Sequence, residues 1–557
     1  AAAGRLADIH RNDAVDPMQV HVIDIESVFN EFGSGSFDPG ALRRCLKMFY
    51  DRGVAQQPSL RYALMLGKGT FDNRGITGVG RSLASPMPLW VSAQSLQESN
   101  SYSTDDYFAF LEDGSGQRPG YDLLSIAVGR IPCTSAQEAE KVVDKIESYL
   151  RDMPRSDWRN RVLMLADDGN QGVHMDQTEL MESSIRMNDG GEKLLFDKVY
   201  IDAYAWQNGS YPQARADFYR LLNSGAMLWT YIGHGSATAL CGDNMITYTD
   251  INTQFYLRRI PFCYAATCSF LRWDNDVRSA AETLMFTDDG GFIGCISALR
   301  PVYISANGDL SKAFGTELSS LDGSSNYYAM GEVYRRAKNR LTNDTNRLRF
   351  VFMGDPALRT VLPSRNVVLE SVNGETVTAD AQITLKAREK LTLSGSVRDL
   401  DGSVMADFNG QISATLYDAD YSTTSRGRGK DGKEVTFDQH GSLLFMAGGE
   451  VKGGRFTMSV TMPSDIADNF RPASLNLYAH STESGDSRDA SGLCRDLYVF
   501  GFDETAADDL VPPVIHSMLV NQESFSSGDD VNETPMVIAR LSDDVGLNLS
   551  SSGVGHQ

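Results

Sequence analysis

Residues 229–236 read Trp-Thr-Tyr-Ile-Gly-His-Gly-Ser, an apolar run that ends in a histidine between two glycines. The run predicts a buried strand, and the glycine that follows predicts its end. Glycine reaches backbone conformations that side chains forbid and allows a second chain to come close. We therefore expect His234 at the carboxyl edge of a sheet, where α/β proteins place their sites. A loop histidine that caps the next helix is the plainer alternative.

A second strand end carries a thiol. Residues 262–270 read Phe-Cys-Tyr-Ala-Ala-Thr-Cys-Ser-Phe, so Cys268 follows His234 by one strand–crossover–strand step. Neighbouring parallel strands would bring both side chains to one edge, and a thiol beside an imidazole is the core of cysteine catalysis. A third strand end, residues 165–169, offers Asp168 to orient the imidazole. An Asx turn or a metal ligand explains Asp168 equally well.

The other cysteines have plainer interpretations. Cys263 lies too early in its strand to share that edge, and Cys295 stands in an apolar run, so both read as core residues. Cys241, in the loop after the histidine, is a weaker rival nucleophile. The chain has no CxxC pair, so a structural zinc site or a disulfide framework is not expected, although one bridge stays open. The seven cysteines are Cys45, Cys133, Cys241, Cys263, Cys268, Cys295 and Cys494.

Strands and helices alternate along the chain as far as residue 362, which predicts βαβ units and a parallel sheet with helices on both faces. The expected strands are 62–67, 123–128, 161–166, 199–201, 226–232, 261–266 and 291–297, and the expected helices are 135–150, 174–187, 214–222, 280–286 and 327–341. After Pro363 short alternating strands predict a β-sandwich. Within it, the polar and Gly-rich residues 422–433 predict a long exposed loop.

The composition excludes some partners. Of 557 residues, 73 are acidic and 51 basic, a net charge of −22. Such a chain is a poor candidate for binding nucleic acid or anionic lipid, which attract Lys and Arg. No apolar run is long enough for a transmembrane helix, and residues 1–5 are not a signal peptide. Both ends read as parts of a longer protein. The acidic loops at Asp105-Asp106 and at Asp274 and Asp276 could hold a structural Ca²⁺, although solvated loop charge is the simpler interpretation.

These features resemble the gingipain family of cysteine peptidases. The resemblance rests on the order and spacing of the histidine and cysteine strand ends and of three short motifs, and covers roughly residues 20–362. The motifs are Val-Gly-Arg-Ile-Pro at 128–132, Ala-Glu-Thr-Leu at 281–284 and Gly-Asp-Pro-Ala-Leu at 354–358.

The resemblance implies a caspase-like parallel-sheet peptidase domain in two subdomains, followed by an immunoglobulin-like β-sandwich. The expected boundaries are 1–20 for a linker from a preceding region, 21–155 and 156–362 for the two α/β subdomains, 363–511 for the sandwich, and 512–557 for the start of a further domain.

It also implies site residues. Cys268 would be the nucleophile, His234 the general base and acid, and Asp168 the acid that orients the imidazole. The backbone N–H groups of Gly235 and Cys268 would form the oxyanion hole. Arginine-specific members have an acidic S1 floor soon after the orienting acid. Here residues 170–174 read Asn-Gln-Gly-Val-His with no acid before Asp176, so a strict preference for Arg or Lys does not carry over.

Further stretches, at 28–36, 102–107, 352–353 and 512–553, resemble family members that act as signal peptidase and sortase in the type IX secretion system of Bacteroidetes. This implies cleavage of the C-terminal signal domain from secreted cargo and transfer of the cargo to an amine on anionic lipopolysaccharide. It implies outer-membrane attachment proteins as partners, a cell-surface location at the Gram-negative outer membrane, and no required cofactor. A catalytically silent cargo-binding module and a surface adhesin are the alternatives.

Overall fold

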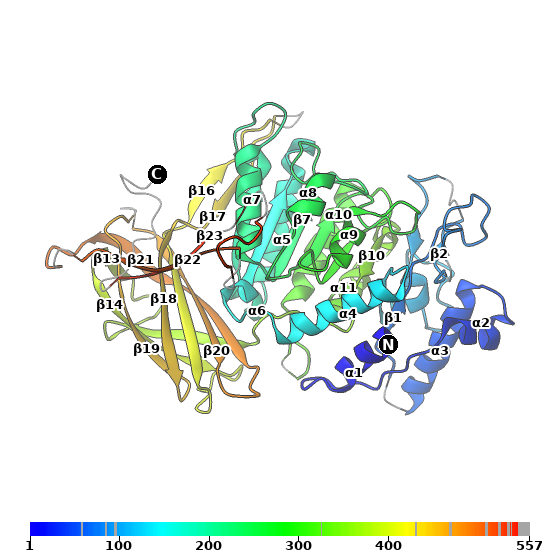
Figure 1. Ribbon diagram of the computed structural model, residues 1–557, viewed down its shortest axis with the longest axis horizontal. Coiled ribbons are helices and arrows are strands. Elements are labelled where there is room, and N and C mark those ends of the chain that lie inside the picture. Colours follow the sequence, from blue (N-terminus) through cyan, green and yellow to red (C-terminus); the bar gives the residue numbers. More distant parts are fainter. Residues whose placement is uncertain are drawn as a thin grey trace. The chain divides into compact units, whose positions relative to one another are not determined.

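The computed structural model describes residues 1–543 except 57–58, 84–85, 94–96, 325, 429–431, 467–469, 507–510, 522–524, 532–534 and 536. The chain folds into two compact units (Figure 1). Unit 1 holds residues 1–154, 158–362 and 423–437, and unit 2 holds 155–157, 363–422 and the chain from 438 onward.

Unit 1 is built on a sheet whose described strands run in the order β1-β4-β10-β9-β8-β7-β5-β6. Strands β9, β8, β7, β5 and β6 are mutually parallel, as are β1, β4 and β10. The two parts meet where β10 pairs antiparallel with β9, so one continuous sheet joins both expected subdomains. The bounds are β1 (Tyr62–Leu66), β4 (Ala127–Ile131), β5 (Arg161–Ala166), β6 (Leu195–Tyr200), β7 (Leu228–Ile232), β8 (Phe262–Ala266), β9 (Gly294–Ala298) and β10 (Phe350–Met353); β2 (Trp90–Val91) and β3 (Ser103–Thr104) pair separately.

Among the helices of unit 1, α10 packs against α5 and α11, α4 packs against α1 and α9, and α2 packs against α3. Helices on both faces are what a parallel sheet requires. In the described chain, none of the helices combines the length and apolar character needed to span a bilayer. The bounds are α1 (Ala2–Arg11), α2 (Ile25–Gly33), α3 (Pro39–Gln56), α4 (Ala136–Arg151), α5 (Val173–Arg186), α6 (Asp189–Glu192), α7 (Pro212–Ser224), α8 (Tyr248–Thr253), α9 (Ala280–Phe286), α10 (Ile304–Leu318) and α11 (Met330–Asn339).

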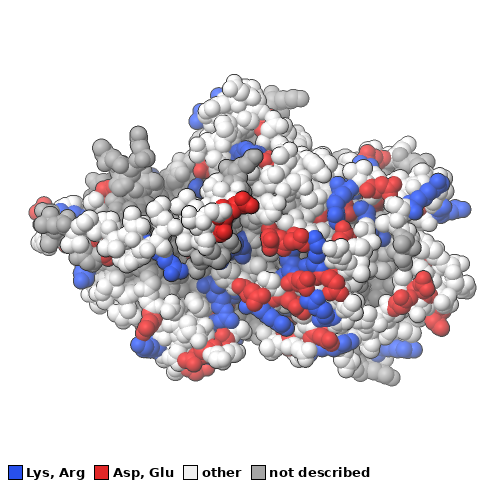
Figure 2. All heavy atoms as spheres, viewed as in Figure 1, with Lys and Arg blue, Asp and Glu red and all other residues white. Residues whose placement is uncertain are grey.

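The segment expected as a linker, residues 1–20, instead contains helix α1. Leu6 is buried in the main core of unit 1, and Arg5 forms ion pairs with three acids of α4. An amphipathic helix with one apolar face buries that face against its neighbour, which a linker cannot do. The acidic partners of Arg5 are Glu140, Asp144 and Glu147. On the surface seen in Figure 2, acidic and basic side chains are interspersed.

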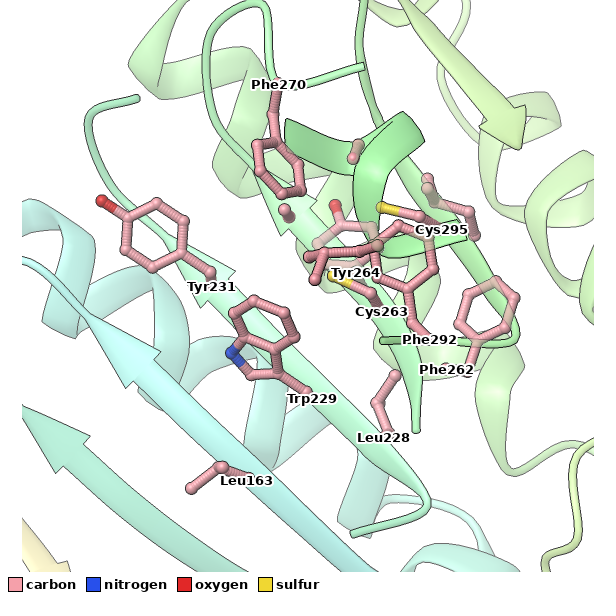
Figure 3. Packing of buried hydrophobic residues seen from close by; sticks show 14 of the residues in the cluster. Leu163, Leu228, Trp229, Tyr231, Phe262, Cys263, Tyr264, Phe270, Phe292 and Cys295 are labelled. Carbon is pink, nitrogen blue, oxygen red and sulfur yellow. The ribbon is translucent and has the colours of Figure 1, made fainter. Parts of the chain in front are cut away.

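The core beneath the candidate site is large and aromatic (Figure 3). Trp229 on β7 is fully buried and packs against Phe218 and Phe255 at ring centroid distances of 5.6 Å. Cys263 on β8 and Cys295 on β9 are paired in register and are both fully buried, as expected for core residues. Because this core holds neighbouring strands in register, their carboxyl ends lie at fixed positions along the sheet.

Unit 2 is a barrel-like sandwich. Its described strands run in the order β12-β11-β14-β19-β18-β15-β20-β21-β13, and a parallel pairing of β11 with β21 closes the sheet on itself. Alternate residues point into its core, as in the buried, exposed alternation of β19. The bounds are β11 (Arg365–Val372), β12 (Glu375–Thr376), β13 (Ile383–Ala387), β14 (Lys390–Arg398), β15 (Gly410–Tyr417), β18 (Leu443–Lys452), β19 (Arg455–Thr461), β20 (Pro472–Ser481) and β21 (Asp489–Phe502), followed by the hairpin β22 (Val514–Val520) and β23 (Val537–Ser542).

The expected exposed loop at 422–433 is confirmed for most of its described residues, since only Ser425 among them is buried. The segment begins in β16 (Tyr421–Thr424), leads to β17 (Thr436–Gln439), and belongs to unit 1 from Thr423 to Phe437. Val435 and Phe437 are buried in its core, and the Phe437 ring lies 4.4 Å from that of Tyr200. The buried Asp202 carboxylate accepts hydrogen bonds from the N–H groups of Gly427 and Arg428. The apolar residues after position 433 anchor this segment.

Lys145 of α4 makes the stability of the fold depend on pH. Its buried ammonium donates to the Leu284 and Met285 carbonyls at the end of α9 (3.2 and 2.8 Å), and burial lowers its pKa from 10.5 to about 7. Between these values the unfolded chain binds a proton that the folded chain releases, so this group makes stability rise with pH from about 7 to 10.5. Lys145→Met should remove that rise, measured by urea unfolding at pH 6 and pH 9.5. An unchanged pH dependence in the variant would contradict it.

Candidate active site

Three strand ends meet at one edge of the sheet. Ala166 of β5 pairs with Ile232 of β7, and Ile232 pairs with Ala266 of β8. Asp168, His234 and Cys268 each stand two residues beyond these aligned positions. The last residues of the three strands are paired with one another. The three sequence-predicted side chains therefore lie in neighbouring loops at the carboxyl edge of the sheet.

The turn that carries His234 is held by Asp167. Asp167 Oδ2 accepts the His234 backbone N–H at 2.8 Å, and its Oδ1 accepts the N–H of Gly169, also at 2.8 Å. The hydroxyl of Tyr231 donates to the His234 carbonyl oxygen at 2.5 Å and lies 3.3 Å from Asp167 Oδ2. Asp167 is buried, so these bonds are shielded from water. The backbone of the histidine is thereby fixed on both sides.

The imidazole of His234 contacts a residue that the sequence did not single out. Asn170 Nδ2 lies 3.0 Å from His234 Nε2 and 3.0 Å from His174 Nε2. The rings of His174 and His234 are in a T-shaped arrangement with centroids 5.2 Å apart. Asn170 and Gln171 both have positive φ (56° and 61°), a strained conformation that tends to mark functional sites. The sequence signal for this turn is the pair Gly169-Asn170 shortly after the strand end, because Asn is among the side chains that adopt positive φ most readily.

Asp168 lies at this edge but contacts a different partner. Its Oδ2 accepts the hydroxyl proton of Tyr211 at 2.6 Å, and burial raises its pKa. In the described residues no hydrogen bond joins Asp168 to His234. The orienting role of Asp168 therefore stays a prediction, while the acid that the structure joins to His234, through the backbone, is Asp167.

Cys268 is half-buried at the end of β8. Its Sγ lies 3.4 Å from the Val302 N, which donates to it, and the thiol faces the Val302 carbonyl oxygen at 3.7 Å. The rival Cys241 is buried, and burial raises its pKa well above the usual value of a thiol. Burial also raises the pKa of Cys133 to about 11. A thiol with a raised pKa is a poor nucleophile, which disfavours Cys241 and Cys133.

The His234 loop and the Cys268 loop are close. A Cβ atom on Gly235 would clash with Thr267 Oγ1, the side chain just before Cys268. Only glycine allows this approach, which brings Gly235 close to the residue that precedes Cys268. The oxyanion-hole role of Gly235 stays a prediction. A cleft of about 450 Å³ has His234 in its lining, and its lining residues all lie between His234 and Tyr248.

The acids considered as possible calcium ligands already have other partners. Asp105 is bound by Arg130, Asp106 by Lys338 and Asp274 by Arg300, at 2.5–2.8 Å. Asp276 accepts the N–H of Gly80 at 2.7 Å. Because three of these carboxylates already have a cationic partner, they lack the uncompensated charge that attracts Ca²⁺.

The first acid after Asp168 in the sequence, Asp176, also has a cationic partner. Asp176 of α5 forms an ion pair with Lys433 at 2.9 Å. Both side chains are about half exposed, so the pair contributes little to stability.

Residues 1–361 match the model of Peptidase family C25. The chain belongs to this family. It therefore shares the gingipain-type α/β fold and the cysteine peptidase class that its strand ends indicated.

Three relatives illustrate the match. The chain is 26% identical over 209 residues to an uncharacterised protein of Archaeoglobus fulgidus, covering 34% of this chain and 51% of the relative. It is 26% identical to dimeric latent PorU from Porphyromonas gingivalis, covering 100% of this chain and 47% of that one, with a TM-score of 0.42. It is 17% identical to the Arg-specific cysteine proteinase gingipain R, covering 89% and 96% with a TM-score of 0.49. The chain thus spans about half the length of the first two.

Proposed function

We propose that this chain is the catalytic part of a cysteine endopeptidase and transpeptidase of type IX secretion. It would remove the C-terminal signal domain of secreted cargo and attach the cargo to anionic lipopolysaccharide at the surface of a Gram-negative outer membrane. The observation that carries the catalytic half is the aligned position of His234 and Cys268 beyond β7 and β8. Membership of family C25 supports the same chemistry. The secretion role, with outer-membrane attachment proteins as partners, rests on the sequence resemblance.

The first half-reaction forms an acyl-enzyme. His234 accepts the Cys268 proton, and the thiolate attacks the scissile carbonyl carbon. The N–H groups of Gly235 and Cys268 stabilise the oxyanion, and protonated His234 then donates its proton to the leaving amine. The thiol must turn away from the Val302 carbonyl oxygen for this, while the Val302 N–H, 3.4 Å from Sγ, can stabilise the thiolate.

The second half-reaction decides between hydrolysis and transfer. His234 deprotonates either water or an acceptor amine, which attacks the thioester and releases Cys268. Water leaves a free carboxylate on the cargo, and an amine leaves an amide. Both outcomes share one intermediate, so a single site supports them.

Mass spectrometry of the new cargo C-terminus tests this proposal. The full chain is incubated with a cargo protein bearing its C-terminal signal domain, with and without glycinamide as a primary amine. We expect a free carboxylate without the amine and an amide-linked product, heavier by the amine less water, with it. A cargo cleaved to the carboxylate alone would refute the transferase part. Intact cargo bound to the wild-type chain would favour the silent binding module.

A further inference from the structure

Three metal-binding side chains meet beside the catalytic histidine. Asp167, His174 and His234 each present one ligand atom, and these atoms all lie within 4.8 Å of one another. His174 Nε2 and Asp167 Oδ1 are 3.8 Å apart. Two ligands at about 2.1 Å from one tetrahedral Zn²⁺ lie roughly 3.4 Å apart, so only a small adjustment is needed.

The burial of His174 has no structural explanation in its hydrogen bonds. The side chain is only 4% exposed, and in the described residues its Nδ1 has no hydrogen-bond partner. The unpaired atom is Nδ1, whereas the atom that faces the cluster is Nε2, so the case for the site rests on the geometry of the three ligand atoms. The Nε2 of His174 faces Asn170 and the shared space with His234.

We propose that Asp167, His174 and His234 form a reversible binding site for a divalent cation of the Zn²⁺ class, which inhibits the peptidase by withholding His234. Two imidazoles and one carboxylate are ligands that suit Zn²⁺, and they leave a fourth position open for water. Asn170 Nδ2 lies between the imidazoles, so its amide turns aside when the cation enters.

The site couples metal binding to the proton chemistry of catalysis. A neutral imidazole has one N–H and one lone-pair nitrogen, so a cation on the Nε2 lone pair of His234 leaves the ring proton on Nδ1 and neither nitrogen can accept the thiol proton. The chain would be inactive while the cation is bound and active once a chelator removes it. The inhibition rests on the proposed peptidase function, but the binding does not.

Isothermal titration with ZnCl₂ tests the site without relying on activity. The starting protein is the full chain with Cys268→Ala, which keeps all three proposed ligands and lacks the nucleophile. We expect one Zn²⁺ per chain. Adding His174→Gln, which is polar but a poor zinc ligand, should weaken binding about 100-fold or more. The matched control is His21→Ala, which removes an exposed histidine elsewhere and should leave the affinity unchanged.

Two results would overturn the proposal. Equal affinity with and without His174→Gln would show that His174 is not a ligand. Loss of Zn²⁺ binding in Cys268→Ala, with binding retained in the wild type, would place the cation on the thiolate and His234 instead. In the wild-type chain, Zn²⁺ should inhibit cleavage and His174→Ala should require about 100-fold more Zn²⁺ for the same inhibition. Circular dichroism confirms that each variant is folded.

Discussion

Cys268→Ala should abolish peptide-bond cleavage, lowering kcat/KM by about 10⁴-fold or more, because the acyl-enzyme cannot form without the nucleophile. The measurement is the initial rate of cleavage of cargo carrying its signal domain, with a thiol-reactive substrate analogue as a second readout. The matched control is Cys241→Ala, which removes a buried thiol near the same edge and should change the rate only a few-fold.

The fold should survive this substitution. Cys268 is half-buried, and among the described residues its sulfur makes hydrogen bonds only with the backbone of Val302. Losing such a group leaves the aromatic core around Trp229 intact, so thermal unfolding should shift by only a few degrees. Wild-type cleavage by a folded Cys268→Ala protein, or loss of activity in Cys241→Ala alone, would move the nucleophile elsewhere.

The sheet edge could be predicted because buried parallel strands are nearly continuous apolar runs. The expected strand at 161–166 matches β5, and the expected helix at 280–286 matches α9. Their bounds are marked by local signals, such as the Ser279 N-cap whose capping box with Glu282 begins α9. Local chemistry of this kind is visible in one sequence without an alignment.

Helix α10 was missed because its residues pack through small side chains rather than a regular apolar stripe. Gly308 and Gly315 lie within it, and a Cβ on either would press on Gln177 or the Met181 carbonyl of α5. Glycine disfavours an isolated helix, so only the tertiary contact with α5 stabilises this one.

The site was predicted in part. Its strand ends carry strong signals, but the contacts of Asn170 and His174 depend on a left-handed turn that the sequence does not specify. The burial of Val435 and Phe437 in the core of unit 1 likewise depends on residues distant in sequence, such as Tyr200. Between two adjacent acids, sequence alone offers no means of telling which one faces the histidine turn.

Asp167→Ala should be the most damaging change outside the nucleophile. It removes the acceptor for the backbone N–H groups of His234 and Gly169. Each of these two donors left unpaired costs about 1–3 kcal/mol, so the free energy of unfolding should fall by about 2 kcal/mol or more. A displaced His234 should also lower kcat about 100-fold or more. Urea unfolding and cleavage rates measure the two effects.

The adjacent acid supplies the decisive control. Asp168→Asn retains an oxygen that accepts the Tyr211 hydroxyl proton and leaves every Asp167 bond in place. If Asp167 holds the catalytic turn, as the hydrogen bonds indicate, Asp168→Asn should change kcat only a few-fold. If Asp168 orients the imidazole during turnover, as the family resemblance implies, Asp168→Asn should lower kcat about 100-fold or more without loss of stability. Stability and kcat falling together at Asp167, and neither at Asp168, would assign positioning of His234 to the backbone of its turn.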